Sequence, residues 1–238
     1  GSEMCIRDSL KMAQSTIRFR AVSRNFKIYL SICRVGLPSL IRQGLTSATM
    51  GLLNNMTKPF GDAAIAAMSV VNRYSNFLIC VGLGIGQGFQ PVASFNYQAR
   101  KYDRVKKGLA FTMCFGLVFI GSFSVISMIC AEGIIGIFQK SEAVIAIGST
   151  ALRYTAIGML FFPFSVPVNM LYQSIQQPTI SSVLSLIRSG AVTIPMLLIG
   201  VPLLGLPGIQ IAQPTADVIA GLLSIPFIIR FLKETPAE

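Results

Sequence analysis

The chain has 238 residues, of which 53% are hydrophobic and only 12% are charged, with a formal net charge of +11. An ordinary soluble domain has about 25% charged residues, so this composition excludes a typical soluble fold with a polar surface. Histidine is absent, which excludes His-based catalytic triads, HExxH zinc sites and imidazole proton relays. The five cysteines are widely spaced and form no CxxC motif, so they indicate neither a disulfide framework nor a metal site.

Long uncharged stretches dominate the rest of the chain. The stretches are Tyr74–Ala99, Gly108–Ala131, Tyr154–Ile187 and Ser189–Ala216. A helix rises about 1.5 Å per residue, so roughly 20 apolar residues cross the ~30 Å core of a bilayer. The sequence therefore predicts an all-α integral membrane protein with the lipid bilayer as its surroundings. The basic residues cluster between the apolar stretches, so the charge predicts membrane topology, and we expect no nucleic-acid partner.

The first 34 residues precede the expected spans. Residues 1–9 have neither an apolar h-region nor a cleavage site. They resemble read-through of a sequencing adapter, so we expect a non-native start. Residues 10–34 carry six basic residues and no acidic one. This pattern predicts a basic cytoplasmic linker beside the membrane, followed by a transmembrane domain over residues 35–238.

Six spans are expected in this domain. Their approximate bounds are Val35–Asn55, Ala63–Phe89, Leu109–Cys130, Ser149–Tyr172, Ile180–Ile199 and Gly208–Phe231. Pro163 and Pro167 are expected to kink the fourth span. The alternate glycines of the second span, from Gly82 to Gly88, indicate close helix packing or a flexible bend. The main connections are expected at Met56–Asp62, Tyr97–Lys107, Gln139–Ala143, Gln173–Thr179 and Pro202–Pro207.

The basic residues are distributed unequally between alternate connections. Seven lie before the first span, five lie in Tyr97–Lys107 and two lie at the end of the chain, whereas the opposite connections hold only Lys58 and Lys140. The positive-inside rule therefore predicts a multi-pass protein of the plasma or inner membrane with both termini in the cytoplasm.

Several charged residues lie inside or at the ends of the expected spans: Arg42, Arg73, Arg153, Arg188 and Asp217. A charge at the bilayer centre costs roughly 2.5–3.5 kcal/mol on the insertion scale, so such residues usually face a bundle interior or a hydrated cavity. Asp217 follows Pro214, which frees a backbone carbonyl one turn earlier. It is either a coupling carboxylate for a cation or proton, or the ion-pair partner of an arginine such as Arg188 or Arg42.

Other polar residues in the first two spans are candidates for the lining of a central cavity. With Asp217, the candidate cavity residues are Arg42, Gln43, Asn72, Arg73 and Asn76. Neutral polar groups near the cytoplasmic ends add to them: Asn96, Asn169, Gln173 and Gln177. The alternative is that arginines reach the headgroups and amides bridge helices, and for Arg153 we favour this alternative. No catalytic residue, metal ligand or cofactor is expected.

Four segments resemble one transporter family. They are GLPSLIRQGLTSATMGLLNN at Gly36–Asn55, GDAAIAAMSVVNR at Gly61–Arg73, GIGQGFQPVASFNYQARKYDRV at Gly84–Val105 and IAQPTADVIAGLLSIPFIIRFLKE at Ile211–Glu234. By these segments the chain resembles the C-terminal lobe of the MATE (multidrug and toxic compound extrusion) family, in its MepA-like branch.

The resemblance implies a twelve-helix antiporter built of two six-helix lobes. It would export small cationic amphipathic drugs in exchange for protons or sodium by alternating access, together with an N-terminal lobe that this sequence lacks. The protein in the cell would then be about twice this length. In several sodium-coupled relatives the first and fourth helices of this lobe carry acids, where this chain carries Arg42 and Arg153. The coupling ion is therefore expected to be a proton rather than sodium.

Three alternatives remain open. A lipid-linked oligosaccharide flippase shares this fold and uses a cationic cavity for a pyrophosphate. The chain could also be a non-transporting membrane fragment, because alternating access needs two lobes. A membrane-embedded enzyme is disfavoured, since the chain has no histidine and only one acid well inside a span.

Overall fold

The computed structural model describes residues 43–175 and 177–234, which are almost entirely helical and contain no strand. Arg42, the expected non-native start at 1–9 and the expected linker at 10–34 lie outside the described residues. The all-helical architecture predicted from the uncharged stretches is confirmed.

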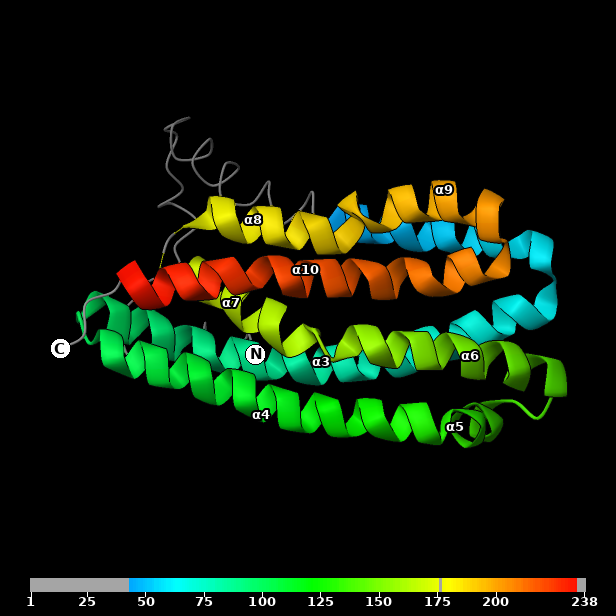
Figure 1. Cartoon of the computed structure of the whole chain (residues 1–238), viewed down its shortest axis with the longest axis horizontal. Helices are drawn as coiled ribbons and strands as arrows, with labels where there is room; N and C mark the ends of the chain where they lie inside the picture. The colour runs from blue at the N-terminus through cyan, green and yellow to red at the C-terminus, as the bar shows by residue number, and fades with distance from the viewer. Residues whose placement is uncertain (1–42, 176, 235–238) are drawn as a thin grey trace, which may run out of the picture. The chain divides into compact units, whose positions relative to one another are not determined.

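A helix over residues 43–57 begins the described chain (Figure 1). The elements that follow are η2 (Lys58–Phe60), α3 (Asp62–Gln98), α4 (Tyr102–Ile129), α5 (Ala131–Phe138), α6 (Glu142–Met159), α7 (Phe162–Ser174), α8 (Pro178–Leu186), η3 (Ile187–Ala191), α9 (Thr193–Leu204) and α10 (Leu206–Glu234).

The helices match the expected spans, except that the first expected span is only partly described. Within the described residues, four helical stretches are long and apolar enough to cross a membrane, at 62–98, 102–129, 179–204 and 206–233. The bent pair of α6 and α7 makes a fifth if it is counted as one span. The first expected span, Val35–Asn55, is described only from residue 43 onward.

The connection between the second and third spans is much shorter than expected. We predicted a loop at Tyr97–Lys107, but α3 continues to Gln98 and α4 begins at Tyr102. The turn is made by three residues, of which Arg100 has a positive φ of 58°. The prediction was wrong because a helix can extend beyond the hydrocarbon core, where water and headgroups solvate its charged side chains.

The fourth span is broken where its prolines predicted a kink. α6 ends at Met159 and α7 begins at Phe162, with an angle of 47° between them. Pro163 occupies the first turn of α7, where a missing backbone N–H costs little. Pro167 lies inside α7 without ending it, so the break belongs to the segment just before Pro163.

Three local features were not predicted. The short helix α5 lies between α4 and α6. The fifth span is kinked within η3 (Ile187–Ala191), where Gly190 has non-helical dihedral angles (φ 174°, ψ −26°). α10 continues as one helix through Pro214, whereas we expected a disrupted helix there.

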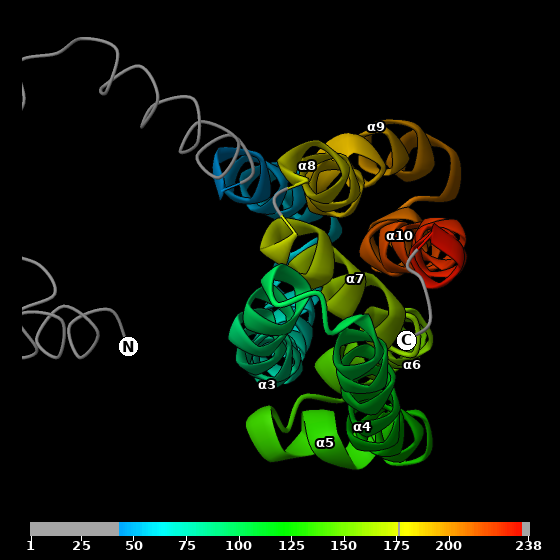
Figure 2. The same ribbon diagram turned by 90° about the vertical axis from the view of Figure 1, so that its left-hand side faces the viewer.

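α7 packs between α3 and α10 (Figure 2), and the buried side chains form several clusters along the helices. One cluster of buried side chains joins α3, α4, α6 and α7 through Leu78, Ile120, Met159 and Phe162. Glycines permit the close approaches: a Cβ on Gly158 of α6 would lie 2.8 Å from the Cα of Pro214 on α10. Small residues at such crossings are the usual means of packing helices in membranes.

Candidate functional site

The fifth and sixth spans are joined by a buried ion pair. The Arg188 Nε on η3 donates to the Asp217 Oδ1 on α10 over 2.8 Å. The side chains are only 21% and 4% exposed. Of the two roles we considered for Asp217, the structure shows the ion pair, and its partner is Arg188.

The aromatic ring of Phe162 gives Arg188 a second contact. The guanidinium carbon lies 4.3 Å from the ring centroid, a distance at which a cation is attracted to the face of an aromatic ring. Phe162 is 1% exposed and belongs to the core cluster at the start of α7. Arg188 is therefore positioned by α10 and by the break in the fourth span.

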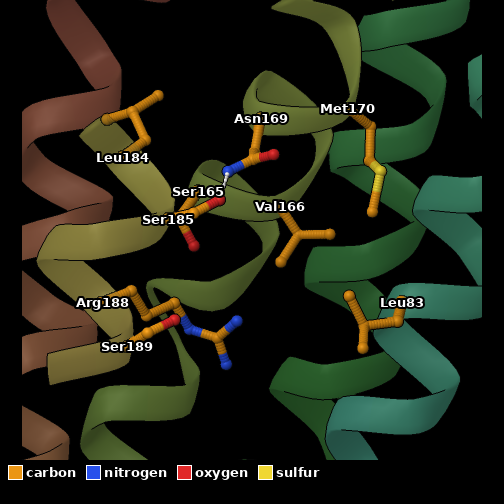
Figure 3. Close-up of a pocket in the computed structure, with 9 residues that line it drawn as sticks. All are labelled: Leu83, Ser165, Val166, Asn169, Met170, Leu184, Ser185, Arg188 and Ser189. Atoms are coloured by element: carbon orange, nitrogen blue, oxygen red, sulfur yellow. Dashed lines mark hydrogen bonds between the residues drawn. The ribbon is translucent and has the colours of Figure 1, made fainter. Parts of the chain in front are cut away.

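A small cavity of about 40 Å³ lies beside Arg188 (Figure 3). It is lined from α3, α7, α8 and η3 by Leu83, Ser165, Val166, Asn169, Met170, Leu184, Ser185, Arg188 and Ser189. Figure 3 shows the guanidinium end of Arg188 pointing across this cavity toward the side formed by Leu83. Drug-sized pockets usually have volumes of about 300–1,000 Å³, so this cavity, called the recess below, is too small to be a whole drug-binding site.

Polar side chains continue from the recess along α7. The Asn169 amide donates to the Ser185 Oγ over 2.6 Å and to the Ser181 carbonyl over 3.1 Å. The Gln173 amide donates to the Asn169 Oδ1 over 2.7 Å, and the Gln90 amide donates to the Gln173 Oε1 over 3.2 Å. Asn169 therefore connects α7 to α8, and the chain of hydrogen bonds extends to α3.

The predicted cavity residues of the first two spans do not line this recess. Gln43, Arg73 and Asn76 are exposed, and Asn72 is half-buried. Asn72, Asn76 and Leu83 are separated by four and seven residues along α3, so they lie on one side of that helix. Since Leu83 lines the recess, the two asparagines lie further along the same side.

Arg153 has a different environment. It forms an ion pair of 3.2 Å with Glu132, and the two side chains are 47% and 68% exposed. Arg153 is therefore exposed, and the preference for a headgroup position over a cavity position stays a prediction.

Sequence reasoning missed part of the recess. Arg188 was considered as a charge facing the bundle interior or the headgroups and as a partner for Asp217, but the serines Ser165, Ser185 and Ser189 were not identified. Their signal is weak, because a serine in an apolar helix usually bonds its own backbone. Among the described residues, no group of three or more potential metal-binding side chains occurs.

Comparisons with known proteins were made for the whole sequence. The MatE family model matches residues 38–199. The multidrug export protein MepA of Staphylococcus aureus (strain NCTC 8325 / PS 47) is 24% identical over 195 residues, which are 82% of this chain and 43% of MepA. The chain therefore spans less than half the length of the curated relatives it matches.

Solved structures show the same fold. A crystal structure of MATE in a bent conformation is 21% identical and has a TM-score of 0.80, over 98% of this chain and 54% of that one. A MOP superfamily transporter from Pyrococcus furiosus, described as having a binding pocket of reverse polarity that suggests a different function, is 20% identical with the same TM-score and coverage.

Proposed function

Because this chain belongs to the MATE family of multidrug efflux transporters and matches its C-terminal lobe in a MepA-like branch, we propose that it forms one lobe of an antiporter that exports cationic amphipathic compounds in exchange for protons. The family is a class of membrane transporters rather than enzymes. The observation that carries the proposed coupling is the buried ion pair between Arg188 and Asp217 beside the recess.

The pair supports a direct electrostatic mechanism. With Asp217 ionised, the pair is neutral and a cation can approach the recess. When Asp217 accepts a proton, the positive charge of Arg188 is no longer compensated. Two unit charges 4–8 Å apart repel by about 2–4 kcal/mol at an effective dielectric constant of about 20, which weakens binding of a cation roughly 30- to 1,000-fold. Protonation and cation binding then exclude each other, as antiport requires.

The geometry favours a proton over sodium in this lobe. The Asp217 Oδ1 already accepts a hydrogen bond from the Arg188 Nε. Sodium would have to displace or share this partner and would need further oxygen ligands, whereas a proton needs only one carboxylate oxygen. This agrees with the lack of acids in the expected first and fourth spans.

The orientation in the membrane forms part of the proposal. The turn between α3 and α4 and the end of α10 lie at the same end of the helices (Figure 1). These segments carry most of the basic residues of the described chain, including Arg100, Lys101 and Lys233. By the positive-inside rule this end faces the cytoplasm of a plasma or inner membrane, with both termini on that side.

Transport in everted membrane vesicles tests the proposal. The chain, joined in frame to the N-terminal lobe of a MATE relative, would be produced in a bacterium lacking its own drug pumps, and uptake of tetraphenylphosphonium would be followed after imposing a pH gradient. We expect gradient-driven uptake that Asp217→Asn abolishes and that Glu132→Gln, in the exposed ion pair, leaves unchanged. Absence of uptake by the unmodified two-lobe protein would contradict the proposed export and favour a non-transporting membrane protein.

One observation favours a second candidate, a lipid-linked oligosaccharide flippase of the same fold. The guanidinium end of Arg188 points into the recess (Figure 3), and a guanidinium can bind a pyrophosphate through two parallel hydrogen bonds. The two functions differ in their response to lipophilic cations. Tetraphenylphosphonium should drive proton movement through a cation exporter and should have no effect on a flippase.

A further inference from the structure

A second and larger cavity opens on the other side of α7. It has a volume of about 280 Å³ and lies between α4, α7 and α10. Its lining residues are Lys106, Leu109, Ala110, Met113, Cys114, Leu117, Phe164, Ile228 and Leu232. All of these side chains are apolar or weakly polar except that of Lys106. The proposed export mechanism uses none of them.

The cavity has the shape of a groove parallel to the helices. The α4 residues that line it recur every three or four positions from Lys106 to Leu117, so they form one stripe along that helix. Eleven residues of α-helix rise about 16 Å. Ile228 and Leu232 are one turn apart on α10 and form the opposite wall. A groove of this direction in a membrane-spanning helix pair follows the direction of a lipid acyl chain.

Positive charge is concentrated at one end of the groove. Lys106 lies within the first two turns of α4, and Leu232 lies within the last turn of α10, so both mark the same end. The segments at this end carry the basic residues Arg100, Lys101, Arg104, Lys107, Arg230 and Lys233, against the acids Asp103 and Glu234. Basic pockets between spans on the cytoplasmic side are suited to anionic lipid headgroups.

We propose that this groove binds an anionic phospholipid, with an acyl chain between α4 and α10 and the phosphate beside Lys106. The apolar wall alone cannot select a lipid, because the surrounding acyl chains are equally apolar. Selection comes from the charge at the end of the groove. Each basic residue close to anionic lipid contributes ~1 kcal/mol, equivalent to about a fivefold preference.

Brominated lipids give a direct test, because the chain contains no tryptophan. Leu117→Trp places a single fluorophore in the groove, and Val118→Trp places one on the neighbouring, 70% exposed position of the same helix. The full chain would be reconstituted in phosphatidylcholine vesicles. Equal mole fractions of acyl-brominated phosphatidylglycerol or acyl-brominated phosphatidylcholine would then be added. Cys114→Trp, on the same stripe, replaces Leu117→Trp if that variant does not fold.

The expected result is selective quenching in the groove. Brominated phosphatidylglycerol should quench the Leu117→Trp fluorescence with an apparent affinity about fivefold higher than brominated phosphatidylcholine. The preference should fall when Lys106→Gln is added and should be absent in Val118→Trp. Equal quenching of Leu117→Trp by both lipids would overturn the proposal. Quenching of Val118→Trp without quenching of Leu117→Trp would also overturn it, and would indicate that a protein surface such as a second copy covers the groove.

Discussion

At the scale of single residues, Arg188 and Asp217 must compensate each other's charge, yet the proposed coupling requires that one of the two charges be neutralised. Two charges with side chains 21% and 4% exposed need one another, because an unpaired charge in a low-dielectric interior is costly. Coupling, in contrast, requires that one of the charges be neutralised during each cycle. The cation–π contact with Phe162 offers Arg188 a second favourable interaction when Asp217 is protonated. The aromatic ring thus makes the protonated state less costly.

The burial of this pair predicts its effect on stability. Asp217→Asn leaves the Arg188 charge mostly buried and uncompensated, so we expect the free energy of unfolding to fall by about 3–5 kcal/mol. Glu132→Gln removes one charge of the exposed pair with Arg153 and should change it by about 0–1 kcal/mol. Urea unfolding in detergent, followed by circular dichroism, measures both. Equal losses in the two variants would show that burial does not distinguish the two pairs.

At the scale of helices, the sequence predicts where the long helices lie better than it predicts where they bend. The uncharged stretches locate the long helices because a bilayer requires about 20 consecutive apolar residues. Pro163 correctly predicts the break in the fourth span, since a proline inside a helix removes a hydrogen bond. The kink within η3, next to Arg188, has no proline to mark it, and Gly190 was not identified as its position. It depends on packing among neighbouring helices, which a single apolar stretch does not encode.

The alternate glycines of α3 also have packing environments that the sequence alone does not distinguish. A Cβ on Gly82 would lie 2.5 Å from Phe162 Cε1 and 2.9 Å from Ile120 Cδ1, whereas nothing lies within 4 Å of one on Gly84. Gly82→Ala should lower the free energy of unfolding by about 1–3 kcal/mol through overpacking. Gly84→Ala should leave it unchanged or raise it by up to about 1 kcal/mol, because alanine favours a helix over glycine.

Thermal unfolding of the two glycine variants in the same detergent compares them directly. Their native secondary structure should be the same by circular dichroism, which serves as the control. If Gly84→Ala were the more destabilising change, the packing of α3 against α7 would differ from the structure. Because Phe162 also contacts Arg188, Gly82→Ala offers a way to disturb the ion pair from a different helix.

At the scale of the whole molecule, the fold could be predicted but the site only in part. Asp217 was identified because placing a carboxylate inside an apolar span costs free energy, so such a residue usually has a functional or structural role. Its partner was narrowed to Arg188 or Arg42, and the choice required the positions of two helices in space. Asn72, Arg73 and Asn76 were grouped by their polarity; they do not line the recess beside Arg188, and their place in a central cavity stays a prediction. Residue type indicates which side chains need partners, while helix packing decides which partners they meet.

The binding of a lipophilic cation as a function of pH tests the coupling mechanism most directly. Tetraphenylphosphonium affinity would be measured by isothermal titration calorimetry on the reconstituted chain. The unmodified chain should bind more tightly as the pH rises, because ionised Asp217 neutralises Arg188. Asp217→Asn should bind weakly at every pH, since Arg188 stays uncompensated.

The double variant Asp217→Asn with Arg188→Gln completes the measurement. It removes both charges, so it should regain affinity within about tenfold of the unmodified chain at high pH, without a pH dependence. If the unmodified chain bound tetraphenylphosphonium equally at all pH values, or if Asp217→Asn kept both its affinity and its pH dependence, the ion pair would not couple protons to cation export.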